Sequence, residues 1–219
     1  MALAHNVGGK MELNEQLKQA LIELRKTPER KFVQSVDLII NLQKFDIKKE
    51  QVNLFVSVPH KIKDKKICGF LEIPSNLIDT VTKSEFKKYS DKKEIKKLVN
   101  KYDFFIAQAS LMPTVATTFG RALGPAGKMP SPQLGILINA DDKVIGELVS
   151  RVNNSVKIKT KEPSIKVCIG KQNMKDEDLI ENIVTVYNAV LKTLIKGKDS
   201  IKNLEVKFTM TKPQKIKVK

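Results

Sequence analysis

The sequence predicts two fold classes in one chain: an α+β part built from both ends and an α/β part inserted between them. Segments near both ends alternate apolar and polar residues, which is typical of strands covered on one face of a sheet. Segments in the middle are compact apolar runs between helical patterns, which indicates strands covered on both faces in a parallel layer. The simplest division assigns residues 1–65 and 155–219 to the first domain and residues 66–154 to the inserted domain, with two chain crossings that act as a hinge.

The first predicted element is an amphipathic helix that begins near Met11 and ends before Pro28. Its apolar stripe consists of Leu13, Leu17, Leu21 and Leu24. Residues 1–10 show no periodicity, so we interpret them either as an arm without fixed structure or as a remnant outside the fold.

Two alternating strands are predicted after this helix, over residues 31–42 and 52–58. The inward face of the first strand consists of Phe32, Gln34, Val36, Leu38, Ile40 and Leu42. Its other face carries Val33, Ser35, Asp37 and Asn41, with Ile39 among them.

The middle of the chain predicts the α/β part. The apolar runs "KICGFLEI" and "YDFFIAQ" are separated by the charged, helix-like segment "SDKKEIKKLVNKY". A short helical stretch, "LMPTVATTFGRAL", leads into a glycine-rich loop, and "DDKVIGELVSRV" predicts a further helix.

The one-sided strand pattern returns at residue 155. Strands are predicted at 156–159 and 165–169, followed by a long helix and a last strand at 204–210. The buried stripe of the helix consists of Leu179, Ile183, Val186, Val190 and Leu194. Acidic residues at 176–178 complement the helix dipole, and Gly197 is expected to cap the helix end.

The charge of the chain favours a polyanionic partner. The 219 residues carry a formal net charge of +16, from 40 basic and 24 acidic side chains. Nucleic acid is the leading candidate, although a lysine-rich solubilising surface explains the same composition. Arginine occurs only at positions 25, 30, 121 and 151, which favours neutralisation of phosphates over bidentate recognition of bases.

The sequence predicts a cytoplasmic protein without a metal or other cofactor. No segment approaches the roughly 18 continuous apolar residues of a membrane span, and the N-terminal segment lacks a signal-peptide core. Cys68 and Cys168 lie singly in apolar runs and are expected to be buried thiols in a reducing compartment. His5 and His60 are too few and too far apart to form a zinc site with these cysteines.

The alternation also predicts the open face of the terminal sheet, if its outer strands form one sheet with helices on one side. This face would carry Ser35, Asp37, Lys157, Lys159, Lys161, Lys166, Lys207, Thr209 and Thr211. Lysines and hydroxyls suit the phosphates and ribose hydroxyls of RNA, but an ordinary solvated sheet face fits the pattern equally well. The tail "TKPQKIKVK" is consistent with an arm along a backbone, and solvated tails of this kind are common.

The stretch "FGRALGPAGKMPSP" at 119–132 looks like a phosphate-binding loop. A P-loop needs Gly-x-x-x-x-Gly-Lys-Ser/Thr, and here Ala122 and Met129 stand where the first glycine and the hydroxyl residue belong. The sequence holds no Ser-His-Asp, Cys-His or paired-carboxylate pattern either. We therefore expect no enzyme and no catalytic residue, and we expect Gly124 and Gly127 to permit a tight turn.

Six stretches, in order along the chain, resemble the archaeal branch of the ribosomal protein L-one family, the protein of the mobile stalk beside the tRNA exit site. They are "KFVQSVDLIINL", "SVPHK", "DFFIAQASLMP", "LGPAGKMPSP", "CIGKQNMKDEDLIENI" and "VKFTMTKPQ". The resemblance implies a split, ferredoxin-like α+β domain that binds RNA and an inserted three-layer, Rossmann-like α/β domain.

The resemblance also implies the partners. They are large-subunit ribosomal RNA at the stalk, deacylated tRNA whose release the protein assists, and in many prokaryotes its own messenger RNA, whose translation it represses. The protein is then expected to be a monomer outside the ribosome. A ribosome-independent RNA-binding regulator of the same fold shares every surface feature and is the alternative function.

The family's RNA-binding segments have counterparts in this chain. Phe32 and Ser35 match a Phe-x-x-Ser/Thr segment, Thr209 and Met210 match a Thr-Met-Gly segment, and Lys171 is a looser match after the "IG" turn. The complete set expected to bind RNA is Lys31, Phe32, Gln34, Ser35, Lys159, Lys166, Lys171, Thr209, Met210, Thr211 and Lys212. The loop residues expected to make secondary RNA or interdomain contacts are Arg121, Gly124, Gly127 and Lys128.

Two departures and two ambiguities accompany this match. Thr211 stands where the family usually has glycine, so either the strand end has ordinary geometry and the Thr211 hydroxyl donates, or the RNA contact is shifted. Ala126 stands where an arginine is usual. Phe32 and Met210 are inward by alternation, so core packing is the alternative to RNA contact for both, and Thr209 and Ser35 are expected to point outward.

Overall fold

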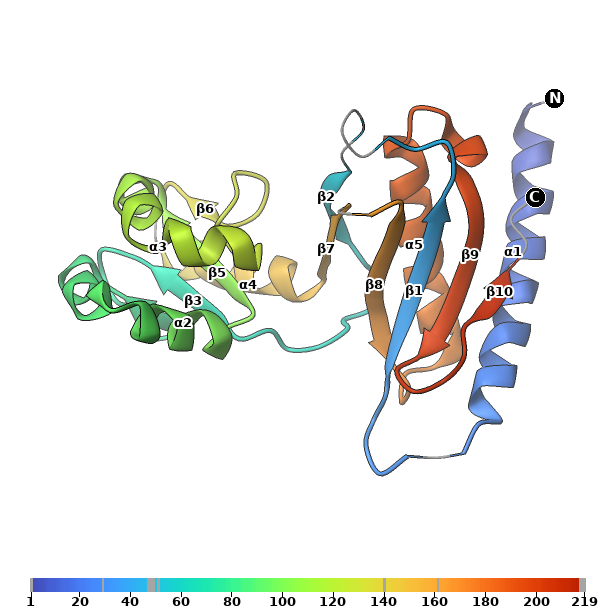
Figure 1. Cartoon of the computed structure of the whole chain (residues 1–219), viewed down its shortest axis with the longest axis horizontal. Helices are drawn as coiled ribbons and strands as arrows, with labels where there is room; N and C mark the ends of the chain where they lie inside the picture. The colour runs from blue at the N-terminus through green and yellow to red at the C-terminus, as the bar shows by residue number, and fades with distance from the viewer. Residues whose placement is uncertain are drawn as a thin grey trace. The chain divides into compact units, whose positions relative to one another are not determined.

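The computed structural model describes the backbone of residues 2–28, 30–46, 50, 52–139, 141–160 and 162–216, and side chains from residue 12 onward except at Ser90. The chain divides into two compact units (Figure 1). Unit 1 comprises Met1–Ile62 with Asn154–Lys219, and unit 2 comprises Lys63–Asn153. The expected mixed class of α+β and α/β elements is confirmed, and each unit is described separately below.

Unit 1 is built on a four-stranded antiparallel sheet with the order β10-β9-β1-β8. Its strands are β1 (Ser35–Leu42), β8 (Ser164–Lys171), β9 (Ile201–Phe208) and β10 (Gln214–Ile216). The helices are α1 (Ala2–Arg25) and α5 (Asp176–Thr193), and a 3₁₀ turn, η3 (Gly197–Ser200), precedes β9. Figure 1 shows the strands side by side, with α5 behind them and α1 next to β10.

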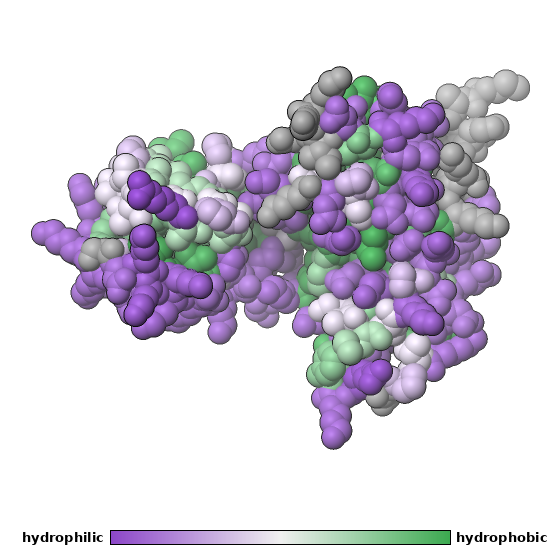
Figure 2. Space-filling view, in the orientation of Figure 1, coloured by the Kyte–Doolittle hydropathy of each residue, from purple (hydrophilic) through white to green (hydrophobic). Residues whose placement is uncertain are grey.

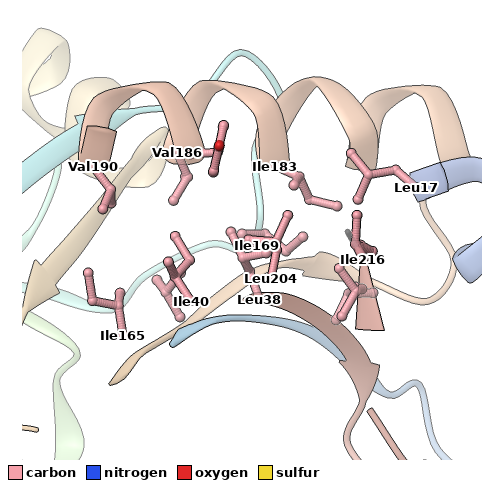
Figure 3. Packing of buried hydrophobic residues seen from close by; sticks show 14 of the residues in the cluster. Leu17, Leu38, Ile40, Ile165, Ile169, Ile183, Val186, Val190, Leu204 and Ile216 are labelled. Carbon is pink, nitrogen blue, oxygen red and sulfur yellow. The ribbon is translucent and has the colours of Figure 1, made fainter. Parts of the chain in front are cut away.

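The core of unit 1 lies between these helices and one face of the sheet. Figure 3 shows Ile183, Val186 and Val190 of α5 pointing toward the side chains of the sheet. Leu17 of α1 lies near Ile216 of β10 in the same view. The stripes predicted for both helices and the alternation predicted for 34–42 are confirmed, because their apolar members are buried. Since these side chains leave water together, hydrophobic burial holds the helices on this face.

Three local expectations for unit 1 are wrong. The first helix starts at Ala2 and not near Met11, since adding residues to an existing helix is favourable and no proline interrupts this segment. The C-terminal segment, expected to be an arm or a solvated tail, contributes β10, which pairs with β9. Gly197 does not cap α5, whose C-cap is Leu194; it lies in η3 with a φ of 53°.

The open face of the four-stranded sheet also differs from the prediction. Strand β7 (Ser155–Lys159), which carries Lys157 and Lys159, pairs with β2 (Asn53–Ser57) in a separate two-stranded sheet. The residues that alternate outward on the larger sheet are Asp37, Ile39, Asn41, Ser164, Lys166, Cys168, Asn203, Glu205 and Lys207. This face is therefore mixed in charge and rich in amides rather than lysine-rich. Lys161 lies outside the described residues.

Unit 2 has a parallel four-stranded sheet with the order β4-β3-β5-β6. The strands are β3 (Ile67–Phe70), β4 (Asp79–Val81), β5 (Phe104–Gln108) and β6 (Ile136–Leu137). The helices are η1 (Lys83–Ser90), α2 (Lys92–Lys101), η2 (Ala109–Leu111), α3 (Met112–Ala126) and α4 (Asp142–Asn153). The two apolar runs of the sequence form the central strands β3 and β5, which are almost wholly buried as their composition predicts.

One face of this sheet holds an aromatic core against α2 and α3. Phe70 stacks on Phe105 with ring centroids 5.6 Å apart, and Phe119 of α3 lies 4.9 Å from Phe70. Burial raises the pKa of the Cys68 thiol in this core to about 12, with a smaller contribution from Asp79, so the thiol is neutral and unreactive.

The glycine-rich stretch is mostly helix, which corrects the expected loop. Helix α3 continues through Gly124 and Pro125 to Ala126, and only Gly127 adopts a positive φ, 69°. Gly127 N–H donates to Gly124 O and Lys128 N–H donates to Leu123 O. These two hydrogen bonds form the pattern of a Schellman cap. Gly127 therefore ends a helix, while Gly124 lies within it.

Candidate nucleic-acid interface

Three segments of unit 1 that are far apart in sequence meet at one end of the four-stranded sheet. Ser35 at the start of β1 is the register partner of Lys171 at the end of β8. Val36 is the partner of Phe208, after which β9 ends and a turn begins. We call the residues brought together here the strand-end cluster: Phe32, Val33, Gln34, Ser35, Lys171, Gln172, Thr209, Met210 and Thr211.

Thr209 ties the turn to the start of β1 through its side chain and its backbone. Ser35 N–H donates to Thr209 Oγ1 at 3.0 Å, and Thr209 N–H donates to Ser35 O at 3.1 Å. The Thr209 hydroxyl also lies 3.4 Å from Ser35 O. Thr209 itself is exposed, as expected, but its hydroxyl holds two chain segments together in addition to facing solvent.

Gln34 lies beneath the same turn. Its side chain is 1% exposed, and its Oε1 accepts a hydrogen bond from Met210 N–H at 3.0 Å. Its backbone oxygen accepts from Gln172 N–H at 2.9 Å. With its side chain buried and bonded in this way, Gln34 positions the turn and the end of β8.

Thr211 closes the turn, which answers the question raised by the missing glycine. Phe208 N–H donates to Thr211 Oγ1 at 2.9 Å, and Thr211 N–H donates to Phe208 O at 3.1 Å. Among the described non-glycine residues only Lys44 has a positive φ, so Thr211 has ordinary backbone geometry. Its hydroxyl satisfies a backbone donor that would otherwise lack a partner at the end of β9.

The apolar side chains of the strand-end cluster are exposed, which corrects the expected inward placement of two of them. Phe32 is 52% exposed and Met210 is 59% exposed, because β1 begins only at Ser35 and β9 ends at Phe208. Val33, which follows Phe32 in sequence, is 54% exposed. Alternation predicts facing only inside a strand, and these residues lie beyond the strand ends.

The expected lysines fall into two groups. Lys171 belongs to the strand-end cluster, and Lys31 and Lys212 are exposed next to it in sequence. Lys166 lies midway along β8, where its Nζ is 3.1 Å from Glu162 Oε2, and Lys159 lies on β7 opposite Asn53. The structure therefore brings Lys171 to the cluster and does not bring Lys159 or Lys166 there.

The four loop residues expected as secondary contacts belong to unit 2. Arg121 is exposed on α3, whereas Lys128 Nζ donates to Val99 O at 2.7 Å and to Tyr102 O at 2.8 Å. Lys128 thereby caps the C-terminal end of α2.

Arg25 is a positioning residue that the sequence patterns did not reveal. It ends α1, and its guanidinium donates to Asp176 Oδ1 at 2.6 and 2.8 Å. It also donates to Gln172 O at 3.0 Å and Met174 O at 2.9 Å, so it fixes the turn that follows Lys171. The sequence has only four arginines, and one of them lies at the predicted end of a helix. That position was the signal from which a positioning role could have been inferred.

The chemistry of this arrangement is that of binding. Exposed apolar groups can cover a base or a ribose, lysines neutralise phosphates, and the hydroxyls and Gln34 hold the backbone in place. His60 is likewise structural, since its ring nitrogen Nε2 lies 2.8 Å from Glu181 Oε2 and its backbone N–H donates to Asn182 Oδ1. Figure 2 shows a mostly hydrophilic visible surface with scattered apolar areas.

Two further observations concern the described residues alone. They contain no group of three or more histidine, cysteine, aspartate or glutamate side chains that could hold a metal ion. In the same part of the chain, none of the helices is both long enough and apolar enough to span a lipid bilayer.

These features define a basic protein of mixed α+β and α/β class. Residues 24–212 match the model of the ribosomal protein L1p/L10e family, and the chain therefore belongs to this family, whose members are ribosomal proteins and not enzymes. The resemblance drawn from the six sequence stretches is thereby confirmed.

Archaeal relatives resemble the chain over most of its length. The large ribosomal subunit protein uL1 of Methanobrevibacter smithii is 37% identical over 194 residues, which cover 83% of this chain and 88% of the relative. The protein of the same name from Pyrococcus abyssi is 34% identical, with 86% and 89% covered. That of Nanoarchaeum equitans is 32% identical, with 90% and 95% covered.

Proposed function

We propose that the chain is a component of the large ribosomal subunit and binds large-subunit ribosomal RNA through the strand-end cluster. Membership of the L1p/L10e family and the names of the relatives support the ribosomal assignment. The observation that carries the RNA-binding assignment is the exposure of Phe32, Val33 and Met210 on a frame tied by Thr209 and Gln34. Solvent-exposed apolar residues on a rigid frame beside lysines suit RNA, because bases stack on apolar surfaces while phosphates meet ammonium groups.

The finer parts of the proposal follow the family resemblance. The RNA target is the mobile stalk near the tRNA exit site, and the bound protein assists release of deacylated tRNA. Outside the ribosome it is a cytoplasmic monomer that represses translation of its own messenger RNA by binding a mimic of the ribosomal site. The split domain, residues 1–65 and 155–219, binds the RNA, and residues 66–154 form the domain that moves on the hinge.

A footprint of the purified protein on large-subunit RNA tests the target. We expect protection concentrated on one stalk helix, and protection spread evenly over the RNA would overturn the proposal. Co-sedimentation with large subunits in high salt separates the ribosomal role from that of a ribosome-independent regulator, which would not sediment with them.

The matched pair Thr209→Val and Thr160→Val tests the cluster. Thr160 Oγ1 accepts from Val52 N–H at 3.0 Å and lies 3.4 Å from Val52 O. These are the same two contacts that Thr209 makes with Ser35, but Thr160 directly follows β7 and is not part of the strand-end cluster. Both changes leave a backbone N–H without its hydroxyl acceptor. The loss of folding free energy should be about 0.5–1.5 kcal/mol at the exposed Thr209 and about 1–3 kcal/mol at the buried Thr160. We expect only Thr209→Val to weaken binding to the stalk RNA, by about tenfold. Equal affinities of the two variants would show that the Thr209 turn is not part of the interface.

A further inference from the structure

Unit 2 contains a cavity of about 350 Å³ at the amino ends of its parallel strands. The first residues of β3 and β4, the C-terminal end of α2 and Val149 of α4 are part of its lining. Its volume lies within the range of small-ligand sites in proteins. None of the residues of the strand-end cluster lines this cavity, so it is a separate feature of the molecule.

The polar part of the cavity lining is strongly basic. Lys65, Lys66 and Lys101 line it, against a single carboxylate, Asp79. That carboxylate is already engaged, because Tyr102 OH donates to Asp79 Oδ2 at 2.6 Å and Lys101 Nζ lies 3.6 Å from the same oxygen. The lining thus carries a surplus of positive charge that an anion would complement.

Lys65, one of these lining lysines, is held in place by the end of α4. Its Nζ donates to Val152 O at 2.6 Å, and Asn153 Oδ1 accepts its backbone N–H, so both ends of the residue are fixed to the end of α4. Burial, and to a smaller extent repulsion by Lys63, lowers the pKa of Lys65 to about 8. A bound anion would favour the charged form of this ammonium group.

The rest of the lining is mostly apolar. Ile67, Ile78 and Val149 form part of it, and Leu77 reaches it with 55% of its surface exposed. A lining that combines three lysines with apolar side chains suits a ligand that has both an anionic and an apolar part. An inorganic anion would engage only the lysines, whereas a nucleotide presents a phosphate and a flat base together.

We propose that this cavity binds one nucleotide, with its phosphate toward Lys65, Lys66 and Lys101 and its base against Leu77 and Val149. The nucleotide is either a free 5′-mononucleotide or one turned out of a bound RNA, since both offer the same chemistry. Only the second source rests on the proposed function.

Titration of the full chain with adenosine and uridine 5′-monophosphates, followed by backbone amide NMR, tests the site. We expect millimolar binding with shifts at Ile67, Ile78 and Val149. Inorganic phosphate and the unphosphorylated nucleosides should each bind at least about tenfold more weakly, because each occupies half of the site. Absence of shifts at these amides would overturn the proposal.

Two matched pairs of variants separate the basic and apolar contributions. Lys101→Gln and Lys92→Gln remove the same charge at opposite ends of α2, and only Lys101→Gln should lower mononucleotide affinity, by about tenfold. Leu77→Ser and Ile138→Ser each remove an exposed apolar side chain of unit 2. Only Leu77→Ser should weaken the mononucleotide, while leaving inorganic phosphate binding unchanged. Equal effects within either pair would show attraction that is not specific to the cavity.

The source of the nucleotide is decided by repeating the Lys101→Gln comparison with the stalk RNA. A loss of RNA affinity relative to Lys92→Gln identifies a nucleotide of the RNA as the occupant, and an unchanged RNA affinity identifies a free mononucleotide. Because the mononucleotide titration involves no RNA, it still decides the cavity's role if the Thr209→Val test overturns the strand-end interface.

Discussion

The sheets of the two units differ in how much of each is buried. Unit 1 has an antiparallel sheet with helices on one face, so its strands alternate, and its other face remains open. Unit 2 has a parallel sheet whose central strands are buried almost throughout. Two of the bonds that build the strand-end cluster join residues 174 and 176 positions apart, whereas unit 2 is one continuous segment. The candidate interface of unit 1 thus depends on segments that are far apart in the chain, whereas unit 2 is formed by consecutive residues.

The largest expected effect comes from separating the chain at the unit boundaries. A fragment of residues 63–153 should unfold cooperatively, because it contains its own sheet and aromatic core. Residues 1–62 alone should not fold, because both neighbours of β1 in the sheet, β8 and β9, belong to the second segment. Circular dichroism and thermal melts of the two fragments measure this difference.

Mixing residues 1–62 with residues 154–219 is the control, since it should restore the unit 1 signals in NMR spectra. A cooperatively folded 1–62 fragment would break the comparison, because it would show that the N-terminal segment does not depend on the distant strands.

The next effect distinguishes two glutamines at opposite ends of β1. Gln34 accepts from Met210 N–H, and Gln43 Nε2 donates to Asp199 O at 3.0 Å. Replacing either with leucine removes a hydrogen bond to the backbone. The loss of unfolding free energy should be about 1–3 kcal/mol for the buried Gln34 and about 0.5–1.5 kcal/mol for the more exposed Gln43. Urea denaturation measures this loss.

Only Gln34→Leu should also weaken binding to the stalk RNA, by at least about tenfold, since Gln43 lies at the other end of the strand. Filter binding at a temperature where both variants remain folded measures the affinity. If Gln43→Leu reduced the affinity as much, general loosening of unit 1 would explain the loss rather than the position of the turn.

The smallest effect concerns the two groups of lysines. Lys171→Gln should reduce the slope of log affinity against log salt by about 0.7–0.9, because one phosphate contact is lost. Lys166→Gln, on the same strand but paired with Glu162, should leave the slope unchanged. Titrations of the stalk RNA at several salt concentrations measure both slopes, and equal slopes for the two variants would place the RNA along the whole of β8.

The regular parts of the fold were predictable because periodicity reports burial directly. The stripes of α1 and α5, the alternation from Gln34 to Leu42 and the apolar runs of unit 2 all depend on local patterns that the structure confirms. The pairing of β7 was not predictable, since alternation gives the faces of a strand but not its neighbours. For that reason Lys157 and Lys159 were assigned to the wrong sheet.

The strand-end cluster could be located by resemblance but not built from periodicity. Phe32 and Met210 follow the inward alternation of their strands in sequence, yet both strands stop short of them. The roles of Gln34 and Thr211 depend on bonds to backbone groups in a turn, and no spacing in the sequence encodes such bonds. The hydrogen-bond partners of Arg25 are not predictable from the sequence either, because they lie about 150 residues away in the chain.

The bond between Ser35 and Thr209 also sets an order of events during synthesis. Ser35 leaves the ribosome that makes the chain long before Thr209, and all of unit 2 is translated between them. Because continuous domains fold as they emerge, unit 2 is complete while β1 still lacks both of its neighbours. On the proposed function, a partly made chain therefore cannot capture the ribosomal RNA, and binding competence arrives only when the turn at 209–211 has been added.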